Sequence, residues 1–212
     1  YYDLSIYGSL ELHQFVTYTK YAGITSFFSD NNGETITSNT VKLTGPVYFN
    51  GTGDWTLVDD FYVDGNVIEH LKGDLYTNNN SVDAWKYSSF DASNQRALIL
   101  GSSVMTLHAE GFEAFVLNGN NFTLNAGTST IRLAGQDTEM RNFNSFGTTF
   151  YNVEFSDSAG RATLNNDFNI FNKLTFNSNG LLTGDNTTGV LRFTIGCDYE
   201  ITSGKNQVIL ID

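Results

Sequence analysis

The chain has 212 residues, with 11 Lys or Arg against 23 Asp or Glu, and its formal net charge is −12 at pH 7. This charge argues against binding to DNA, RNA or an anionic membrane surface, because each of these requires a basic face. The single Cys197 excludes an internal disulfide and a multi-cysteine metal site. No apolar run approaches the roughly 18 residues of a membrane-spanning helix. A hydrophobic content of 40% with 14% aromatic residues indicates a folded chain with a core.

Short strand patterns fill the chain, whereas no long window shows the apolar spacing of a helix. The predicted strands run three to five residues each and are rich in β-branched and aromatic residues. In chain order they are 47–49, 55–57, 74–77, 97–100, 122–124, 129–133 and 152–155. Turn dipeptides such as Asn50-Gly51, Asp64-Gly65 and Asn118-Gly119 separate them. These signals are typical of a β-sandwich, a propeller or a solenoid.

An internal repeat favours the solenoid. Residues 56–63 align without gaps with residues 163–170, at an offset of 107. Successive leucines at 57, 75, 98 and 124 are 18, 23 and 26 residues apart, which is the length of one coil of a parallel solenoid. The sequence therefore predicts an all-β, right-handed parallel β-helix (β-solenoid) with irregular coils of about 18–26 residues, the hand following the general rule for parallel crossovers. It also predicts that Leu57 lies beside Leu75.

The predicted organisation is one continuous solenoid segment over residues 1–212. Within it, residues 34–212 carry recognisable repeats, and residues 1–33 are Tyr- and Phe-rich coils that have diverged. The chain starts at Tyr1 rather than Met, and we expect it to be a piece of a longer or processed protein.

Several stretches resemble the repeat regions of giant cell-surface adhesins of Bacteroidetes, which the type IX system secretes and which include the gliding-motility adhesins. The stretches are 49–61, 71–79, 96–103, 125–131 and 150–155. Together they span about residues 34–200. The resemblance implies a β-helical repeat, an extracellular location at the cell surface, and a role in attachment or gliding motility.

Carboxylates are the first candidates for chemistry, since some β-solenoids cleave polysaccharides. Asp59, Asp60 and Asp64 lie within six residues. They are compatible with a calcium site or with a carboxylate pair beside Lys72 or Arg96 that acts on a sugar. The favoured interpretation is corner charge in contact with solvent, since the spacing does not fit an EF-hand loop. The three histidines are scattered and predict neither a triad nor a metal site.

Aromatic residues are the better candidates for binding. Trp55 and Trp85, together with Asp59 and Asp60, are the candidate carbohydrate contacts, although stacked aromatics also fill the cores of such rods. Ser158 lies in Asp157-Ser158-Ala159, which resembles the O-glycosylation motif of exported Bacteroidetes proteins; a plain turn is the alternative.

The sequence thus predicts a non-catalytic extracellular rod segment of a surface adhesin, with no cofactor and no catalytic or metal-binding residue. The expected partners are further coils of the same chain, a surface polysaccharide or other adhesion target, and the secretion or gliding machinery through regions outside this segment. Neither nucleic acid nor membrane insertion is expected. The alternative is a carbohydrate-active β-helix enzyme, either a lyase or a hydrolase. A third hypothesis is a passive scaffold inside a larger surface complex.

Overall fold

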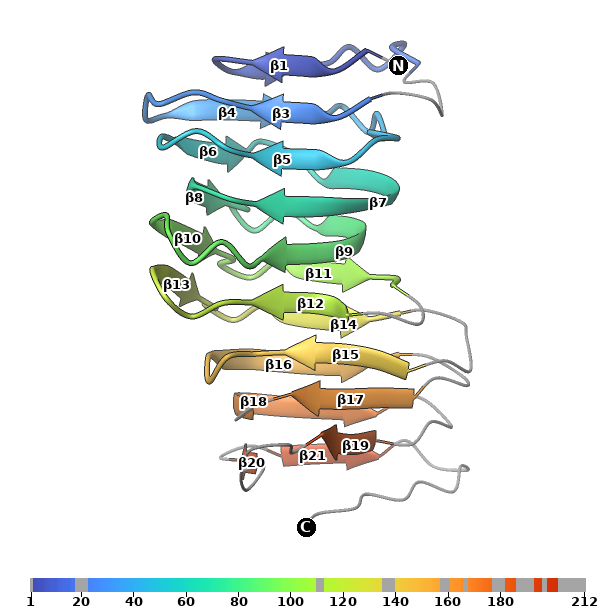
Figure 1. The fold of residues 1–212 in the computed structure, drawn as a ribbon. Coiled ribbons are helices and arrows are strands. Elements are labelled where there is room, and N and C mark those ends of the chain that lie inside the picture. The colour runs from blue at the N-terminus through green and yellow to red at the C-terminus, as the bar shows by residue number, and fades with distance from the viewer. Residues whose placement is uncertain are drawn as a thin grey trace.

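The computed structural model shows short parallel strands wound into a β-solenoid, and the described part of the chain contains no helix, so none that could span a membrane (Figure 1). The predicted all-β parallel solenoid is therefore confirmed. The structure describes residues 2–17, 23–109, 113–134, 140–156, 161–165, 168–176, 182–185, 193–195 and 198–201.

Three ladders of parallel strands run along the rod, and each coil contributes to them in turn. Ladder 1 lies at the front in Figure 1 and contains β1 (Leu4–Ile6), β3 (Thr25–Phe27), β5 (Val47–Phe49), the second halves of β7 (Phe61–His70) and β9 (Val82–Ser89), β12 (Glu113–Leu117), β15 (Met140–Asn144), β17 (Arg161–Asn165) and β19 (Leu182–Asp185). Ladder 2 contains β2 (Leu10–Glu11), β4 (Glu34–Thr37), β6 (Asp54–Leu57), β8 (Gly73–Tyr76), β10 (Arg96–Ile99) and β13 (Phe122–Asn125). Ladder 3 contains the first halves of β7 and β9, then β11 (Val104–Leu107), β14 (Thr130–Leu133), the second halves of β16 (Thr149–Phe155) and β18 (Phe168–Phe176), and β21 (Asp198–Ile201). The remaining strand, β20 (Phe193–Ile195), pairs with the first half of β18.

Register between coils confirms most of the predicted leucine stacking and corrects one pair. Leu75 pairs with Leu98 and Leu98 with Leu124. Leu57, however, pairs with Ile36, and it is Trp55 that stands opposite Leu75. The predicted Leu57–Leu75 pair was wrong because alternate residues of a strand face the same side, so the neighbouring inward position fits the pattern equally well.

Coil length varies along the rod. The register offset between successive coils is 19 residues from Ile68 to Tyr87 and 29 residues from Glu113 to Asn142. In the 19-residue coil, one bent strand, β9, serves both ladder 3 and ladder 1. In β7 the pairing shifts between Val63 and Val67, and Gly65 lies in this bend with φ of 62°.

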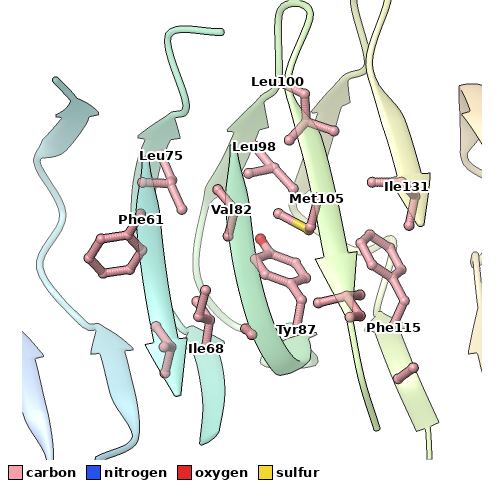
Figure 2. Packing of buried hydrophobic residues seen from close by; sticks show 14 of the residues in the cluster. Phe61, Ile68, Leu75, Val82, Tyr87, Leu98, Leu100, Met105, Phe115 and Ile131 are labelled. Carbon is pink, nitrogen blue, oxygen red and sulfur yellow. The ribbon is translucent and has the colours of Figure 1, made fainter. Parts of the chain in front are cut away.

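Apolar side chains from the three ladders meet in one continuous core (Figure 2). Because the strands are parallel and in register, like side chains stack on like along the axis. The rings of Phe27 and Phe49 stack at 5.0 Å. In another column of ladder 1, the rings of Tyr87, Phe115 and Phe143 stack at 5.3 and 4.9 Å. On ladder 3, Val82 pairs with Met105, which is followed by Ile131 and Val153 in the same column.

Glycine permits close contact of successive coils at the corner that follows ladder 2. Gly127 has φ of 52°, and a Cβ placed there would lie 2.2 Å from the carbonyl oxygen of Gly101 in the preceding coil. The same oxygen accepts a hydrogen bond from the Thr128 N–H at 2.7 Å. A side chain at position 127 would therefore force the two coils apart.

We expect Gly127→Ala to destabilise the rod more than Gly65→Ala. Both glycines have positive φ, so both substitutions cost about 1–2 kcal/mol of left-handed strain. Only the methyl group added at position 127 meets backbone, which adds about 1–3 kcal/mol of overpacking, whereas nothing lies within 4 Å of the Cβ position at Gly65. Urea unfolding of the two variants measures the difference, and equal midpoints would contradict the predicted contact.

Candidate binding surface

Trp55 lies in the core and offers no surface to a sugar. Its side chain is fully buried, with its rings 5.9 Å from Phe27 and 5.8 Å from Phe49. Its indole Nε1 has no hydrogen-bond partner. The expectation that Trp55 contacts carbohydrate is therefore corrected, because its strand directs this alternate position inward.

Asp59 and Asp60 hold the corner between ladder 2 and ladder 3. The backbone N–H groups of Ser38 and Asn39, one coil earlier, donate to the two carboxylate oxygens of Asp59 at 2.8 and 2.5 Å. The N–H of Ser81, one coil later, donates to Asp60 Oδ1 at 2.7 Å. These carboxylates thus satisfy turn N–H groups that the ladders leave unpaired, as a capping residue does at a helix end.

The structure does not bring together the basic partners that an active carboxylate pair would require. Lys72 lies at the opposite corner, between ladder 1 and ladder 2, whereas Asp59 and Asp60 lie between ladder 2 and ladder 3. Arg96 is buried and donates to the carbonyl oxygens of Asn94 and Asn118, both at 2.9 Å. Among the described residues, no group of three or more His, Cys, Asp or Glu side chains is arranged to hold a metal ion.

Polar and aromatic side chains align from coil to coil on the outer surface of ladder 3. The outward row of this ladder, in register, consists of Tyr62, Asp83, Thr106, Arg132 and Glu154. Trp85 follows Asp83 by two residues, in the bend between the two halves of β9, and it is partly buried against the core cluster. It is therefore not a member of this surface row.

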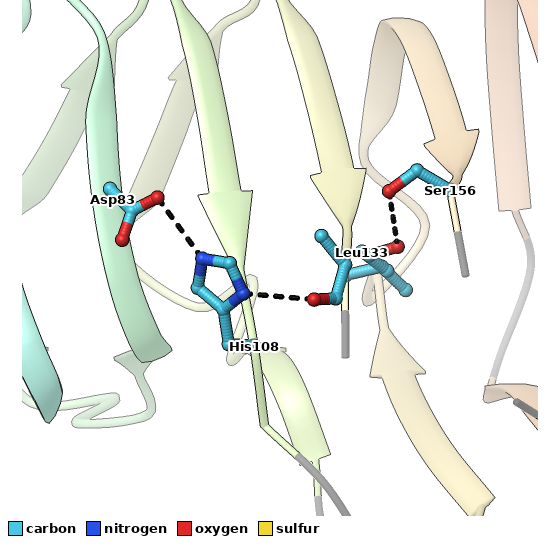
Figure 3. Close-up of polar contacts among 5 residues, drawn as sticks. Asp83, His108, Leu133 and Ser156 are labelled. Carbon is cyan, nitrogen blue, oxygen red and sulfur yellow. Dashed lines mark hydrogen bonds and ion pairs between the residues drawn. The ribbon is translucent and has the colours of Figure 1, made fainter. Parts of the chain in front are cut away.

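Ion pairs on this surface tie neighbouring coils together (Figure 3). His108 Nε2 lies 3.0 Å from Asp83 Oδ2 in the preceding coil, and His108 Nδ1 lies 2.8 Å from the Ala134 carbonyl oxygen in the following coil. Both partners only accept hydrogen bonds, so only the doubly protonated ring satisfies both. One coil further, Arg132 Nε donates to Glu154 at 2.9 Å. The Asp83–His108 pair is about two-fifths exposed, which limits such a pair to about 1 kcal/mol.

A polar cluster interrupts the apolar core at the corner between ladder 1 and ladder 2. His70 occupies the position that follows Phe27 and Phe49 along the column, and Ser89 comes next. Tyr87 O–H lies 2.7 Å from His70 Nδ1, and His70 Nε2 lies 2.9 Å from the Gly73 carbonyl oxygen. A neutral ring protonated on Nε2 satisfies both contacts.

The second half of this cluster joins Ser89 to Arg96. Ser89 Oγ donates to the His70 carbonyl oxygen at 2.9 Å and accepts from Arg96 Nε at 2.8 Å. Burial lowers the pKa of His70 to about 4 and raises the pKa of the Tyr87 hydroxyl. His70 therefore stays neutral near pH 7. Arg96 keeps its charge, because its guanidinium donates to Ser89 Oγ and to the carbonyl oxygens of Asn94, Asn118 and Asn120.

Ladder 2 carries one stacked pair of acids on its outer surface. Asp54 and Asp74 are register partners on β6 and β8. Partial burial, followed by the neighbouring Asp54 charge, raises the pKa of Asp74. The same two carboxylates, after burial, raise the pKa of Tyr76. This pair did not emerge from the sequence, because its members are 20 residues apart and only the register places them together.

Ser158 and Cys197 lie outside the described residues, so the O-glycosylation prediction at Ser158 stays a prediction. Asp64 is exposed, with its N–H donating to the Leu43 carbonyl oxygen at 2.8 Å. No protein-family model, curated protein or solved structure matches the chain. Its class is therefore defined by the fold and surface alone: a parallel β-solenoid whose coils are joined by polar bridges at corners and on one face.

We expect the contribution of His70 to the stability of the chain to fall by about 2 kcal/mol as the pH drops from 7 to 5. The unfolded chain binds this proton near the ordinary pKa of 6.5, but the folded chain binds it only near pH 4. Between these values the unfolded state holds more protons, so acid favours unfolding. Urea unfolding at the two pH values measures the loss.

The matched variants are His70→Gln and His13→Gln. The first removes the buried imidazole and reduces the difference between the two pH values, whatever its effect on stability at pH 7. The second removes an exposed imidazole and leaves the difference in place. An undiminished difference in His70→Gln would contradict the assignment.

Proposed function

We propose that this chain is a non-catalytic rod segment of a large extracellular adhesin, which spaces and presents binding surface outside the cell for attachment or gliding motility. The observation that carries the proposal is the use of polar groups to join coil to coil. Asp59, Asp60, His108 and Arg132 each bond to a neighbouring coil. These side chains support a rod rather than a reaction.

The architecture supports reach along one axis. In a solenoid each coil contacts its neighbours, so stability is approximately a sum of coil and interface terms and does not require a large globular core. Each additional coil therefore lengthens the rod by about 4.8 Å. The net charge of −12 supports solubility and suits a segment exposed to water along its whole length.

Secretion by the type IX system, a Bacteroidetes source and a location at the outer surface are part of this proposal and rest on the resemblance of the repeat stretches. The proposed partners are further coils of the same protein and an adhesion target, with the secretion or gliding machinery engaged through other regions.

An antibody raised against the 212-residue chain is expected to label intact cells of the source organism, and removal of the segment from the gene is expected to reduce attachment to surfaces. Labelling only after cells are permeabilised would contradict the proposal. The matched control is the same antibody after absorption with the purified chain.

The second candidate function is a carbohydrate-active enzyme, and the stacked Asp54–Asp74 pair is the observation that favours it. A carboxyl group whose pKa is raised, as burial raises that of Asp74, is suited to general acid catalysis on a glycosidic bond beside a second carboxylate. Under the rod proposal, we expect no release of reducing or unsaturated sugar from a polysaccharide panel above the background of Asp74→Asn. Release by the wild-type chain that Asp74→Asn abolishes would favour the enzyme.

A further inference from the structure

One column of residues, three of them exposed aromatics, follows the corner between ladder 1 and ladder 2, just after the ladder 1 strands. The register places these residues directly above one another. They are Tyr7, Phe28, Asn50, Leu71, Phe90, Asn118 and Phe146, and we call them the corner ridge. Backbone hydrogen bonds confirm the alignment, because the N–H groups of Phe28, Asn50, Leu71 and Asn118 each donate to the residue before the ridge position of the preceding coil. The ridge follows the turns at the left of Figure 1.

The aromatic rings of the ridge are held in place yet open to solvent. Tyr7 and Phe28 stack at 5.6 Å with an angle of 23° between their planes. The Phe146 ring lies against Gly119, where a Cβ would come within 2.6 Å of it. The exposed fractions are 71% at Tyr7, 58% at Phe90 and 44% at Phe146. Exposed aromatic rings that are aligned along one axis, rather than scattered singly, point to a place where a partner binds.

The surroundings of the ridge are small, hydroxylated and poor in cations. The outward row of ladder 1 beside it contains Ser5, Ser26, Tyr48, Glu69, Ser88 and Val116. Glu69 is the one acid in that row, and burial raises its pKa. On the other side, the next position of each coil is Gly8, Ser29, Gly51, Lys72, Asp91, Gly119 or Gly147. Lys72 is thus the single cation beside the described ridge.

This composition selects one kind of partner. A polyanion would need several cations and would be repelled by the net charge of −12. An uncharged polymer with apolar faces and hydroxyl groups fits exposed rings whose accessible polar neighbours are Ser5, Tyr48 and Asn118. The serines at positions 26 and 88 are buried. Successive ridge positions are about 4.8 Å apart, so a linear polymer that lies along the rod can meet the exposed rings of Tyr7, Phe90 and Phe146 in turn.

We propose that the corner ridge binds an extended neutral polysaccharide lengthwise, with the rings of Phe90, Phe146 and the Tyr7–Phe28 stack against its sugar rings. The inference rests on the proposed adhesive function and names its target class and its site. It differs from the sequence prediction, in which Trp55 and Trp85 were the candidate sugar contacts.

The test uses the 212-residue chain and retention by neutral polysaccharides, either insoluble (cellulose, chitin) or embedded in a native gel (mannan, xyloglucan, dextran). The variant Phe90→Ser/Phe146→Ser is expected to bind about tenfold more weakly to whichever neutral glycan retains the wild type, since loss of two ring contacts at about 0.5–1.5 kcal/mol each gives this order of change. The matched control is Phe171→Ser, which removes an equally exposed ring, 68% open, from the bend of β18 on a different corner.

Phe90→Ser alone and Tyr7→Ser extend the test, because these two rings are the most exposed and their loss is the least expected to affect folding. Each is expected to weaken retention, and unfolding midpoints verify that the variants remain folded. Equal loss in Phe171→Ser, retention of the wild type by alginate or pectate but by no neutral glycan, or no retention at all would each overturn the proposal. Sedimentation that shows a dimer dissociated by Phe90→Ser/Phe146→Ser, without glycan binding, would assign the ridge to a second copy of the chain instead.

The two proposals fail separately. Surface labelling and attachment of cells test the adhesive role without reference to the ridge, and retention by glycans tests the ridge without reference to location. If the chain is found at the cell surface but no neutral polysaccharide retains it, the adhesive role stands and the ridge proposal is rejected.

Discussion

In-register parallel stacking is the constraint on which the rest of this structure depends. Each residue has the corresponding residue of the neighbouring coil directly above or below it, about 4.8 Å away, so side-chain choice at one position is coupled along the whole column. Apolar columns gain from this coupling, as the Phe27–Phe49 and Phe115–Phe143 stacks show. Columns of like charge lose by it: at the Asp54–Asp74 pair, partial burial and then the Asp54 charge raise the pKa of Asp74. The same coupling turns exposed rings at one corner into a continuous ridge.

Polar residues inside the rod obey the same constraint by bonding in sets. His70 and Ser89 occupy successive coils and Arg96 follows Ser89 on β10, and each satisfies the groups that its neighbour leaves open. A buried polar group without a partner costs about 1–3 kcal/mol, so such a cluster persists only when it is nearly complete. Arg96 completes the cluster by donating hydrogen bonds to the turn carbonyl oxygens of Asn94, Asn118 and Asn120. Removal of one member would therefore leave several groups unsatisfied in two coils.

Sequence reasoning predicted the fold because fold depends on local signals repeated many times. Short strands, Asn- and Gly-rich turns and a loose period were sufficient for a parallel solenoid, and Leu75, Leu98 and Leu124 stack as expected. The exact register was not predictable, since inward positions alternate and Trp55 takes the place expected for Leu57. The aligned segments 56–63 and 163–170 also lie one ladder apart: β6 belongs to ladder 2 and β17 to ladder 1. Their similarity therefore reflects a shared strand–corner–strand pattern rather than the same place in the coil.

The corner ridge and the Asp54–Asp74 pair were missed for a related reason, because their members are a full coil apart and nothing local connects them.

The corner between ladder 3 and ladder 1 differs along the rod. In β7 and β9 one bent strand passes through it without interruption, whereas five residues separate β11 from β12 and six separate β14 from β15. The ladders on either side keep their parallel pairing through this change. Extra residues can therefore be inserted at this corner without displacing the other two corners of the coil. Insertions at this corner are therefore expected to be tolerated during evolution, because surface loops can lengthen and diversify there while the stacked strands stay unaltered.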